Sequence, residues 1–244
     1  MKKKQYGLIG YPLSHSFSPG YFAKKFERLG LIDHQYDLYP LEDISQFSDI
    51  SGVAGLNVTI PYKEQIIPYL DELSDDAKAI GAVNTIKFDG DRRIGYNSDV
   101  FGFEQSLIKL WSSGSQPSKG LILGTGGAAK AVRFVLEKLD IAYQQVSRSA
   151  GDFTYDNLPE EVISSHHLII NTTPLGMSPK VDECPAISYD VISSDHILYD
   201  LIYNPAKTLF LRKGEKRAAT IKNGLEMLEL QAEKSWSIWT SEDL

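Results

Sequence analysis

The segment GLILGTGGAAKA, residues 120–131, limits the possible fold of this chain more than any other feature of its sequence. An apolar run typical of a buried strand ends at Gly124, and an alanine-rich, helix-like run follows. Gly124, Gly126 and Ala129 have the G-x-G-x-x-G/A spacing of a dinucleotide-binding turn. The first glycine permits a tight turn, the second lets a pyrophosphate approach the backbone, and the helix N-terminus offers unpaired N–H groups to that anion. The segment predicts a nucleotide-binding βαβ unit, with an empty glycine turn as the alternative.

The end of the next strand-like run, IAYQQVS, indicates which nucleotide would bind. An NAD site usually carries an acidic residue there, about 20 positions after the first glycine, to hold the ribose 2′-OH. This chain has Ser147, Arg148 and Ser149 instead. A guanidinium flanked by hydroxyls suits a 2′-phosphate, which favours NADP as the cofactor. The alternative for Arg148 is an ordinary solvent-exposed arginine.

The part of the chain before the glycine turn also alternates between strand-like and helix-like segments. Apolar runs at residues 6–9 and 35–38 and the run GLNVTIP predict strands, and a DG turn at residues 89–90 predicts a hairpin. Ser18 followed by Pro19 predicts an N-cap and the start of a helix, and a second helix is expected after Pro61. Such alternation favours an α/β fold.

The boundaries between domains are indicated by composition and periodicity. The 244 residues are 42% hydrophobic, which is enough for one large domain or two modest ones. Residues 112–120 lack periodicity and are rich in Ser, Gly, Pro and Gln, so they are the best candidate for a boundary or linker. Residues 225–239 have apolar side chains at spacings of three and four, which predicts an amphipathic helix that must pack against another part of the chain.

Charge and cysteine content argue against several other classes of protein. The formal net charge is -7, and the only basic run is Lys2 to Lys4, so nucleic acid is an improbable partner. We see neither a signal peptide nor an apolar run of about 20 residues, so we expect a cytoplasmic protein without a membrane span. One cysteine, Cys184, and five mostly scattered histidines make an internal disulfide impossible and a metal site improbable.

Polar side chains gather where apolar segments of the first half end. The run SHSFSP places serines directly before a helix, and the runs GLNVTIPYK, GAVNT and GYNSD add amides, a lysine and an aspartate. Each of these residues alone fits a cap, a turn or a solvent-exposed position. Together they suit a polyhydroxylated substrate, because amides and hydroxyls both donate and accept while a Lys/Asp pair can move a proton. The set from the last three runs is Asn57, Thr59, Lys63, Asn84 and Asp99.

The order of these motifs resembles one family. SHSFSP, NVTIPYK, GAVNT, YNSD, GTGGAAKA, SRS, NTTPLGM, YDLIYNP and NGLEMLELQ follow one another as in shikimate dehydrogenases, over essentially the whole chain. The resemblance implies an N-terminal α/β substrate-binding domain, residues 1–98 plus 225–244, and a Rossmann-type NADP-binding domain, residues 99–224. The C-terminal helix would return to the first domain.

The resemblance also implies a role for each matching residue. Lys63 and Asp99 resemble the catalytic pair, and Ser16 and Ser18 resemble the serines that bind the substrate carboxylate. The remaining substrate-binding positions would be Asn57, Thr59, Asn84, Tyr203 and Gln231, with Asp99 also holding a ring hydroxyl. The cofactor-binding positions would be Gly124, Thr125, Gly126, Gly127 and Ala128 for the pyrophosphate, Ser147, Arg148 and Ser149 for the adenosine phosphate, Thr172 and Thr173 along the cofactor, and Gly224 near the nicotinamide.

The reaction implied is the reversible, NADP-dependent reduction of 3-dehydroshikimate to shikimate in chorismate and aromatic amino acid biosynthesis, by a monomer or a homodimer. The loop SRSAGDFTYD departs from the family, since it lacks a second basic residue after Arg148 and turns acidic. One alternative is therefore a quinate/shikimate dehydrogenase with broader substrate use or NAD. A nonenzymatic nucleotide-sensing module would have no use for Lys63 and Asp99, and another lysine-using Rossmann dehydrogenase would leave SHSFSP unexplained.

Overall fold

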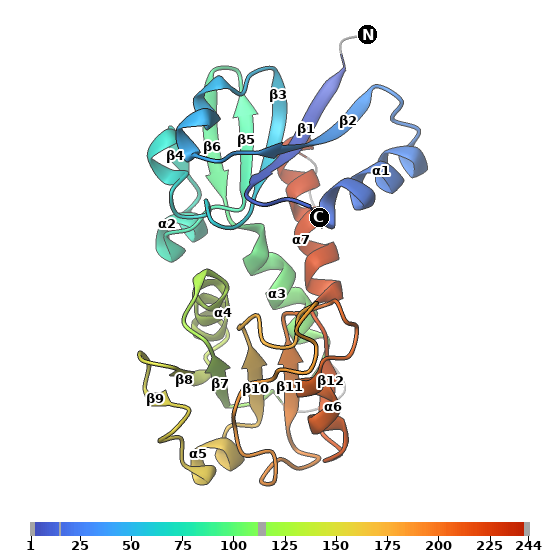
Figure 1. Ribbon diagram of the computed structural model, residues 1–244. Helices are drawn as coiled ribbons and strands as arrows, with labels where there is room; N and C mark the ends of the chain where they lie inside the picture. Colours follow the sequence, from blue (N-terminus) through green and yellow to red (C-terminus); the bar gives the residue numbers. More distant parts are fainter. Residues whose placement is uncertain (1–2, 15, 112–115, 242–244) are drawn as a thin grey trace. The chain divides into compact units, whose positions relative to one another are not determined.

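The computed structural model describes residues 3–14, 16–111 and 116–241 (Figure 1). Its contacts divide the chain into two compact units, Met1–Phe101 with Gln231–Leu244, and Gly102–Leu230. The division falls inside helices α3 (Ser98–Ile108) and α7 (Leu225–Thr240), whereas the boundaries expected from the sequence lie at the N-termini of these helices. Part of the expected linker, residues 112–115, lies outside the described residues.

The second unit is built on a fully parallel sheet. Its strands are β7 (Lys119–Leu123), β8 (Ala142–Ser147), β9 (Phe153–Thr154), β10 (Leu168–Asn171), β11 (Ile197–Asp200) and β12 (Thr220–Lys222). They lie in the order β12-β11-β10-β7-β8-β9 (Figure 1). All neighbours are parallel, and numbering from β7 gives the doubly wound order 3-2-1-4-5-6 of dinucleotide-binding domains. The helices of this unit are α4 (Gly127–Lys138), α5 (Glu160–Ser165) and α6 (Leu209–Glu215).

The strands at the centre of this sheet are continuous apolar runs. Leu121 to Leu123 of β7 and Leu168 to Ile170 of β10 have no solvent exposure. Such runs are typical of parallel strands, because helices cover both faces of a parallel sheet. The strand order reverses between β7 and β10, and the crevice at such a switch point is where doubly wound sheets bind ligands.

The first unit has a mixed sheet. Its strands are β1 (Lys4–Gly10), β2 (His34–Pro40), β3 (Val53–Val58), β4 (Glu72–Leu73), β5 (Thr85–Asp89) and β6 (Arg92–Tyr96), in the order β2-β1-β3-β5-β6-β4. The helical segments are α1 (Ser18–Leu29), α2 (Asp75–Ile80) and the 3-10 turns η1 (Ile44–Asp49) and η2 (Ile67–Tyr69). β1 and β3 are parallel, whereas β5 is antiparallel to both β3 and β6. The ends of β1, β3 and β6 and the start of β5 therefore share one edge of the sheet.

The last helix completes the core of the first unit. Tyr6, Phe22 and Phe26 form one apolar cluster with Trp236 and Trp239 of α7. The indole Nε1 of Trp239 also donates a hydrogen bond to the backbone oxygen of Ile86, at 3.0 Å. The predicted α/β class and the predicted return of the C-terminal helix to the N-terminal unit are confirmed.

Two local predictions are wrong. Helix α1 begins at Ser18 itself, and the preceding Phe17 has helical dihedral angles and makes no side-chain cap, so Ser18 does not act as an N-cap. The segment after Pro61 forms turns and the short η2 instead of an α-helix. The cause lies in Pro68, which has no N–H to donate and disfavours helical geometry at the residue before it.

Candidate active site

The sheet edge described above gathers polar side chains from distant parts of the first unit. Residues 16–18 follow β1, residues 57–59 end β3, residue 84 precedes β5, and residues 98–99 follow β6. Gly10 and Thr59 are close enough that a Cβ at Gly10 would lie 2.4 Å from the Thr59 Cγ2 atom. The predicted residues at this edge are Ser18, Asn57, Thr59, Asn84 and Asp99, and Ser16 lies in the segment between β1 and α1.

Lys63 and Asp99 form an ion pair at this edge. The Lys63 Nζ atom lies 2.7 Å from Asp99 Oδ2, and the two side chains are 26% and 16% exposed. The turn after β3 carries Lys63, whose backbone oxygen accepts a hydrogen bond from the N–H of Val83 at 2.7 Å. Asp99 lies in the first turn of α3, where the helix dipole favours a carboxylate. The pair is therefore held by two separate elements and remains accessible to a ligand.

The amide of Asn84 is oriented by the start of α3. Its Oδ1 atom accepts a hydrogen bond from the backbone N–H of Ser98 at 2.7 Å. Asn84 is only 3% exposed, and its backbone N–H donates to the oxygen of Tyr96 at 3.0 Å. With the oxygen end of the amide fixed toward Ser98, the Nδ2 end must point in another direction, where it can donate to a ligand.

Asn57 contacts protein groups at both ends of its amide. The hydroxyl of Tyr36 donates to Asn57 Oδ1 at 2.8 Å, and Asn57 Nδ2 donates to the hydroxyl of Ser235 at 2.9 Å. Tyr36 also bonds to the side chain of Ser18, and burial raises the pKa of the Tyr36 phenol while this bond opposes the rise. The hydroxyl of Ser16 donates to the backbone oxygen of Leu13 at 3.0 Å.

Tyr36, Thr85 and Ser235 belong to this edge, although sequence reasoning missed them. Tyr36 and Thr85 lie on strands and Ser235 lies on α7; Thr85 ends the motif GAVNT but was given no role there, and Tyr36 and Ser235 lie outside the quoted motifs. Gln231, which was predicted, is 7% exposed and accepts a hydrogen bond from Ser98 Oγ at 3.3 Å. A possible signal was the spacing of Gln231 and Ser235, which places both on one face of a helix.

The glycine turn of the second unit has the geometry that its sequence predicts. Gly124 has a φ of +115°, and a Cβ there would lie 2.6 Å from Thr172 Oγ1. Only glycine fits both the dihedral angle and this close approach. A Cβ at Gly126 would meet nothing within 4 Å, so the space beside this residue is open to a ligand. The turn after β7 and Thr172 after β10 thus meet at the switch point of the sheet.

A pocket of about 450 Å³ extends from this turn to the end of β8. Its lining residues are Gly124, Thr125, Gly126, Ser147, Arg148, Ser149, Tyr155, Thr172, Thr173, Pro174 and Leu175. The structure thereby brings together most of the predicted cofactor residues. Gly127 and Ala128 are not part of this lining and lie exposed in the first turn of α4.

Within the loop after β8, one hydroxyl is engaged by the loop itself. Ser147 Oγ accepts hydrogen bonds from the backbone N–H groups of Ala150 at 2.8 Å and Ser149 at 3.3 Å, and it donates to the oxygen of Ala150. Among the lining residues that the structure describes, Arg148 is the only lysine or arginine. It is therefore the one full positive charge of this pocket.

The buried carboxyl group of Asp200 holds Asn171, which in turn holds the pocket residue Thr173. Asn171 Oδ1 accepts hydrogen bonds from Thr173 Oγ1 at 2.7 Å and from the Thr173 N–H at 3.0 Å, while Asn171 Nδ2 donates to Asp200 at 3.0 Å. Burial raises the pKa of Asp200 to about 6, although bonds from Thr208, Ile202 and Asn171 favour its charged form. Sequence reasoning did not find Asn171 or Asp200.

Two predicted residues lie elsewhere in the second unit. Tyr203 follows β11 and Gly224 precedes α7. A Cβ at Gly224 would lie 2.1 Å from the backbone oxygen of Leu201, so the close approach of the two chain segments requires glycine there. Neither residue lines the pocket beside the glycine turn.

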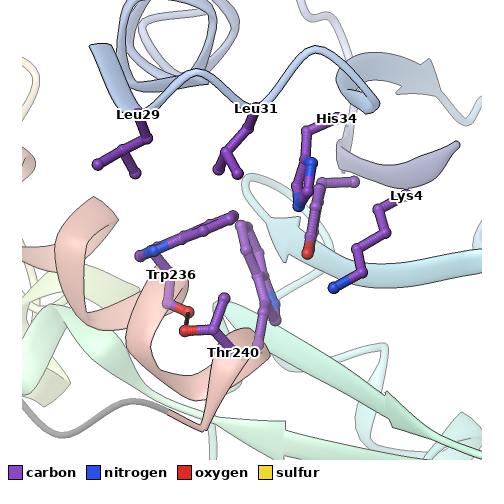
Figure 2. Close-up of a pocket in the computed structure, with 8 residues that line it drawn as sticks. Lys4, Leu29, Leu31, His34, Trp236 and Thr240 are labelled. Carbon is purple, nitrogen blue, oxygen red and sulfur yellow. Dashed lines mark hydrogen bonds between the residues drawn. The ribbon is translucent and has the colours of Figure 1, made fainter. Parts of the chain in front are cut away.

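A second pocket, of about 460 Å³, lies in the first unit and contains none of the predicted site residues. Figure 2 shows Leu29 and Leu31 facing Trp236 and Thr240 across it, with His34 and Lys4 on a third side. Tyr6 and Trp239 complete the lining.

No group of three or more His, Cys, Asp or Glu side chains in residues 3–14, 16–111 and 116–241 is arranged to hold a metal ion. Within the same ranges, no helix has the length and apolar character needed to cross a membrane.

A doubly wound sheet with a glycine turn at its switch point, in a chain that also carries a lysine–carboxylate pair, defines a dinucleotide-dependent oxidoreductase. A family model described as the shikimate dehydrogenase substrate binding domain matches residues 8–86. The chain is 40% identical to the shikimate dehydrogenase (NADP(+)) of Carboxydothermus hydrogenoformans, over 96% of this chain and 90% of that protein. The chain belongs to the shikimate dehydrogenase family.

Two further relatives agree with this assignment. The shikimate dehydrogenase (NADP(+)) of Methanococcus maripaludis is 38% identical, over 98% of this chain and 92% of that protein. A solved structure of shikimate 5-dehydrogenase from Thermus thermophilus, in complex with NADP(H) and shikimate, is 29% identical. It superposes with a TM-score of 0.85 and covers 98% of this chain and 94% of that chain. The resemblance drawn from the motifs is confirmed.

Proposed function

We propose that this protein is an NADP-dependent shikimate dehydrogenase that reversibly reduces 3-dehydroshikimate to shikimate, within chorismate and aromatic amino acid biosynthesis. Family membership supports the reaction class. The observation that carries the proposal for this chain is the pair of Lys63 and Asp99, 2.7 Å apart, at a sheet edge rich in amides and hydroxyls. We further propose that it acts in the cytoplasm as a monomer or a homodimer.

Lys63 is the proposed proton donor. When hydride reaches the ring carbon of the substrate, the carbonyl oxygen gains negative charge and needs a proton. An ammonium group at that oxygen stabilises the charge and supplies the proton, and the neutral amine takes it back in the oxidative direction. Asp99 holds Lys63 in position through the ion pair.

The other polar groups of the first unit would bind the substrate. Ser16 and Ser18 are the proposed partners of the substrate carboxylate, because hydroxyls close to a helix N-terminus suit an anion. Hydroxyl groups of the ring would be held by groups that both donate and accept. These are the proposed roles of Asn57, Thr59, Asn84, Asp99 and Gln231, together with Tyr203.

The residues of the second unit fit NADP. The open space beside Gly126 can admit a pyrophosphate, and Thr172 and Thr173 line the same pocket as the glycine turn. NADP supplies or takes up the hydride when it is bound. Arg148 is the proposed partner of the 2′-phosphate, with Ser149 beside it, while Ser147 shapes the loop through its internal bonds. Gly124 to Ala128 would bind the pyrophosphate, and Gly224 would lie near the nicotinamide.

We therefore propose residues 1–98 plus 225–244 as the substrate-binding domain and residues 99–224 as the NADP-binding domain, and Asp99 and Tyr203 of the second range keep their proposed roles toward the substrate. One alternative is a broader quinate/shikimate dehydrogenase that also uses NAD, which is favoured by the single cation of the cofactor pocket. A nonenzymatic nucleotide-sensing module remains a weaker alternative, because it would not need the Lys63–Asp99 pair.

An absorbance assay of reduced nicotinamide tests the proposal directly. The purified protein is given shikimate or quinate, each with NADP or NAD, and the four initial rates are compared. We expect the highest kcat/KM with shikimate and NADP. A higher kcat/KM with quinate or NAD would support the broader enzyme, and no reaction with any pair would contradict the enzyme proposal.

A further inference from the structure

Ser235 occupies the centre of the polar groups at the sheet edge of the first unit. It lies one turn after Gln231 on α7 and has no solvent exposure. Four protein groups contact its hydroxyl. These are Asn57 Nδ2 at 2.9 Å, Thr85 Oγ1 at 2.8 Å, Ser98 Oγ at 3.1 Å and the backbone oxygen of Gln231 at 3.0 Å.

The hydroxyl proton of Ser235 has one partner that can only accept. The backbone oxygen of Gln231 takes this proton, which leaves the two lone pairs of the Ser235 oxygen to accept. Asn57 Nδ2 can only donate, so it fills one lone pair. The second lone pair is available to the hydroxyl of Thr85 or Ser98.

Without Ser235, these two hydroxyls would be left with each other, 3.1 Å apart, and with Asn84. Thr85 Oγ1 and Ser98 Oγ each lie 3.2 Å from Asn84 Oδ1, which already accepts from the Ser98 N–H at 2.7 Å. A carbonyl oxygen has two lone pairs, so it cannot serve all three donors at once, and one hydroxyl would have to turn to the other. Ser98 could turn to Gln231 Oε1 at 3.3 Å, which would change the contacts of a second amide.

We propose that Ser235 is a positioning residue for the substrate. By accepting from Asn57 Nδ2 and from one of the two hydroxyls, it holds the amide of Asn57 and leaves Asn84 Oδ1 and Gln231 Oε1 with fewer competing donors, so that these three amides keep their orientation toward the ligand. This inference rests on the proposed function, since it assumes that these three amides bind shikimate. It assigns to α7 a second task beside the packing of Trp236 and Trp239.

The test compares the steady-state kinetics of Ser235→Ala with the wild type. Loss of one neutral hydrogen bond is worth about 1 kcal/mol, so we expect the KM for shikimate to rise roughly 3- to 10-fold. The KM for NADP should stay within about twofold of the wild type, because the substitution leaves the second unit intact. A purely structural role would lower the melting temperature without moving the KM of the folded enzyme.

Two further variants distinguish the effect of losing the hydrogen bonds of Ser235 from the effect of disturbing the packing of a buried serine. Ser235→Cys keeps the shape of the side chain with a somewhat larger sulfur atom that is a weak acceptor, so it should raise the KM for shikimate in the same direction. Ser106→Ala is the matched control, because Ser106 is also fully buried and its hydroxyl lies 2.6 Å from Tyr199 Oη in the second unit. We expect this control to lower stability and to leave the KM for shikimate unchanged.

The outcomes distinguish the positioning role of Ser235 from the proposed function of the protein. An active wild type with an unchanged KM for shikimate in both Ser235 variants overturns the positioning role alone. Equal increases in the KM for shikimate and for NADP would also overturn it. If Ser235→Ala does not fold, Ser235→Cys decides the question. A wild type without activity toward shikimate overturns the proposed function and this inference together.

Discussion

Lys63 and Arg148 are the two side chains on which the proposed chemistry depends most directly, and their surroundings differ. Lys63 is three-quarters buried and paired with Asp99. Arg148 is exposed on the loop after β8, and its backbone is shaped by the bonds that Ser147 makes to Ser149 and Ala150. We therefore expect substitution of Lys63 to affect turnover, and substitution of Arg148 to affect the choice of cofactor.

The first prediction concerns Lys63→Ala. Loss of a general acid typically lowers kcat by a factor of about 10²–10⁴, and we expect that loss here with a change of only a few-fold in the KM for shikimate. Steady-state rates at saturating NADP measure both constants. Asp99→Asn, which keeps a hydrogen-bonding group but removes the charge, should lose less. Equal losses of kcat and of affinity for shikimate would contradict the proton-transfer role.

The second prediction concerns Arg148→Ala. A hydrogen bond to a charged group is worth roughly 1.5–3 kcal/mol, so the KM for NADP should rise about 10- to 100-fold. The KM for NAD should change little, since NAD has no 2′-phosphate. Rates measured over a range of each cofactor provide the comparison. Arg217→Ala, a substitution of an exposed arginine that is not part of the cofactor pocket, serves as a control. A parallel rise for both cofactors would show that Arg148 does not recognise the phosphate.

At the scale of the elements, α7 and β3 approach each other closely at Gly55. A Cβ at Gly55 of β3 would lie 2.2 Å from the Cδ1 atom of Trp239, whose ring is buried and also bonded to Ile86. The indole cannot move away without losing that bond and its packing against Tyr6 and Phe22. The position of α7 on the sheet thus requires glycine at residue 55, because any side chain there would collide with the Trp239 ring.

We predict that Gly55→Ala destabilises the protein by roughly 1–3 kcal/mol, as overpacking of a well-packed core does. Gly20→Ala is the matched control, because Gly20 lies in α1 and a Cβ there would meet nothing within 4 Å. That control should be stabilising by about 0.5–1 kcal/mol, since alanine favours a helix. Urea unfolding of the two variants measures both effects, and a shift of the same sign in both would contradict the packing argument.

The elements differ in how well the sequence predicts them. The strand, turn and helix around Gly124 are predictable because glycine spacing, apolar runs and helix start all agree. The prediction of a helix after Pro61 was wrong, because it did not take into account that Pro68 disfavours helical geometry. Thr85 ends a motif and Ser235 shares a helix face with Gln231, but the sequence does not show that the two residues meet. They are 150 positions apart in the chain, and only the fold brings their hydroxyls within 2.8 Å of each other.

At the scale of the whole molecule, the raised pKa of Asp200 makes the free energy of unfolding depend on pH. Burial raises its pKa to about 6, compared with about 3.9 in an unfolded chain. Between these values the folded state binds a proton that the unfolded state does not. The stabilisation from this proton is therefore complete below about pH 4 and is lost as the pH rises through 6.

We predict that Asp200→Asn, which remains neutral, removes this dependence. The free energy of unfolding of the variant relative to the wild type should increase by on the order of 1 kcal/mol between pH 5 and pH 7.5. Urea titrations at pH 5, 6 and 7.5 measure the difference. A difference that stays constant over this range would show that the pKa of Asp200 is not raised in the folded protein.

The insertion of the second unit into the first also determines when the first unit can be completed during synthesis. Residues 102–230 lie between its two parts, which is 230 − 101 = 129 residues. At about 5–20 residues per second, the ribosome needs roughly 6–26 s to make them. Tyr6, Phe22 and Phe26 are separated from the tryptophans of α7 by this stretch and by the rest of the first unit, so they wait longer still. The first half of the chain is thus the first to be made and among the last to fold, so its exposed aromatic cluster is where a nascent chain would need a chaperone.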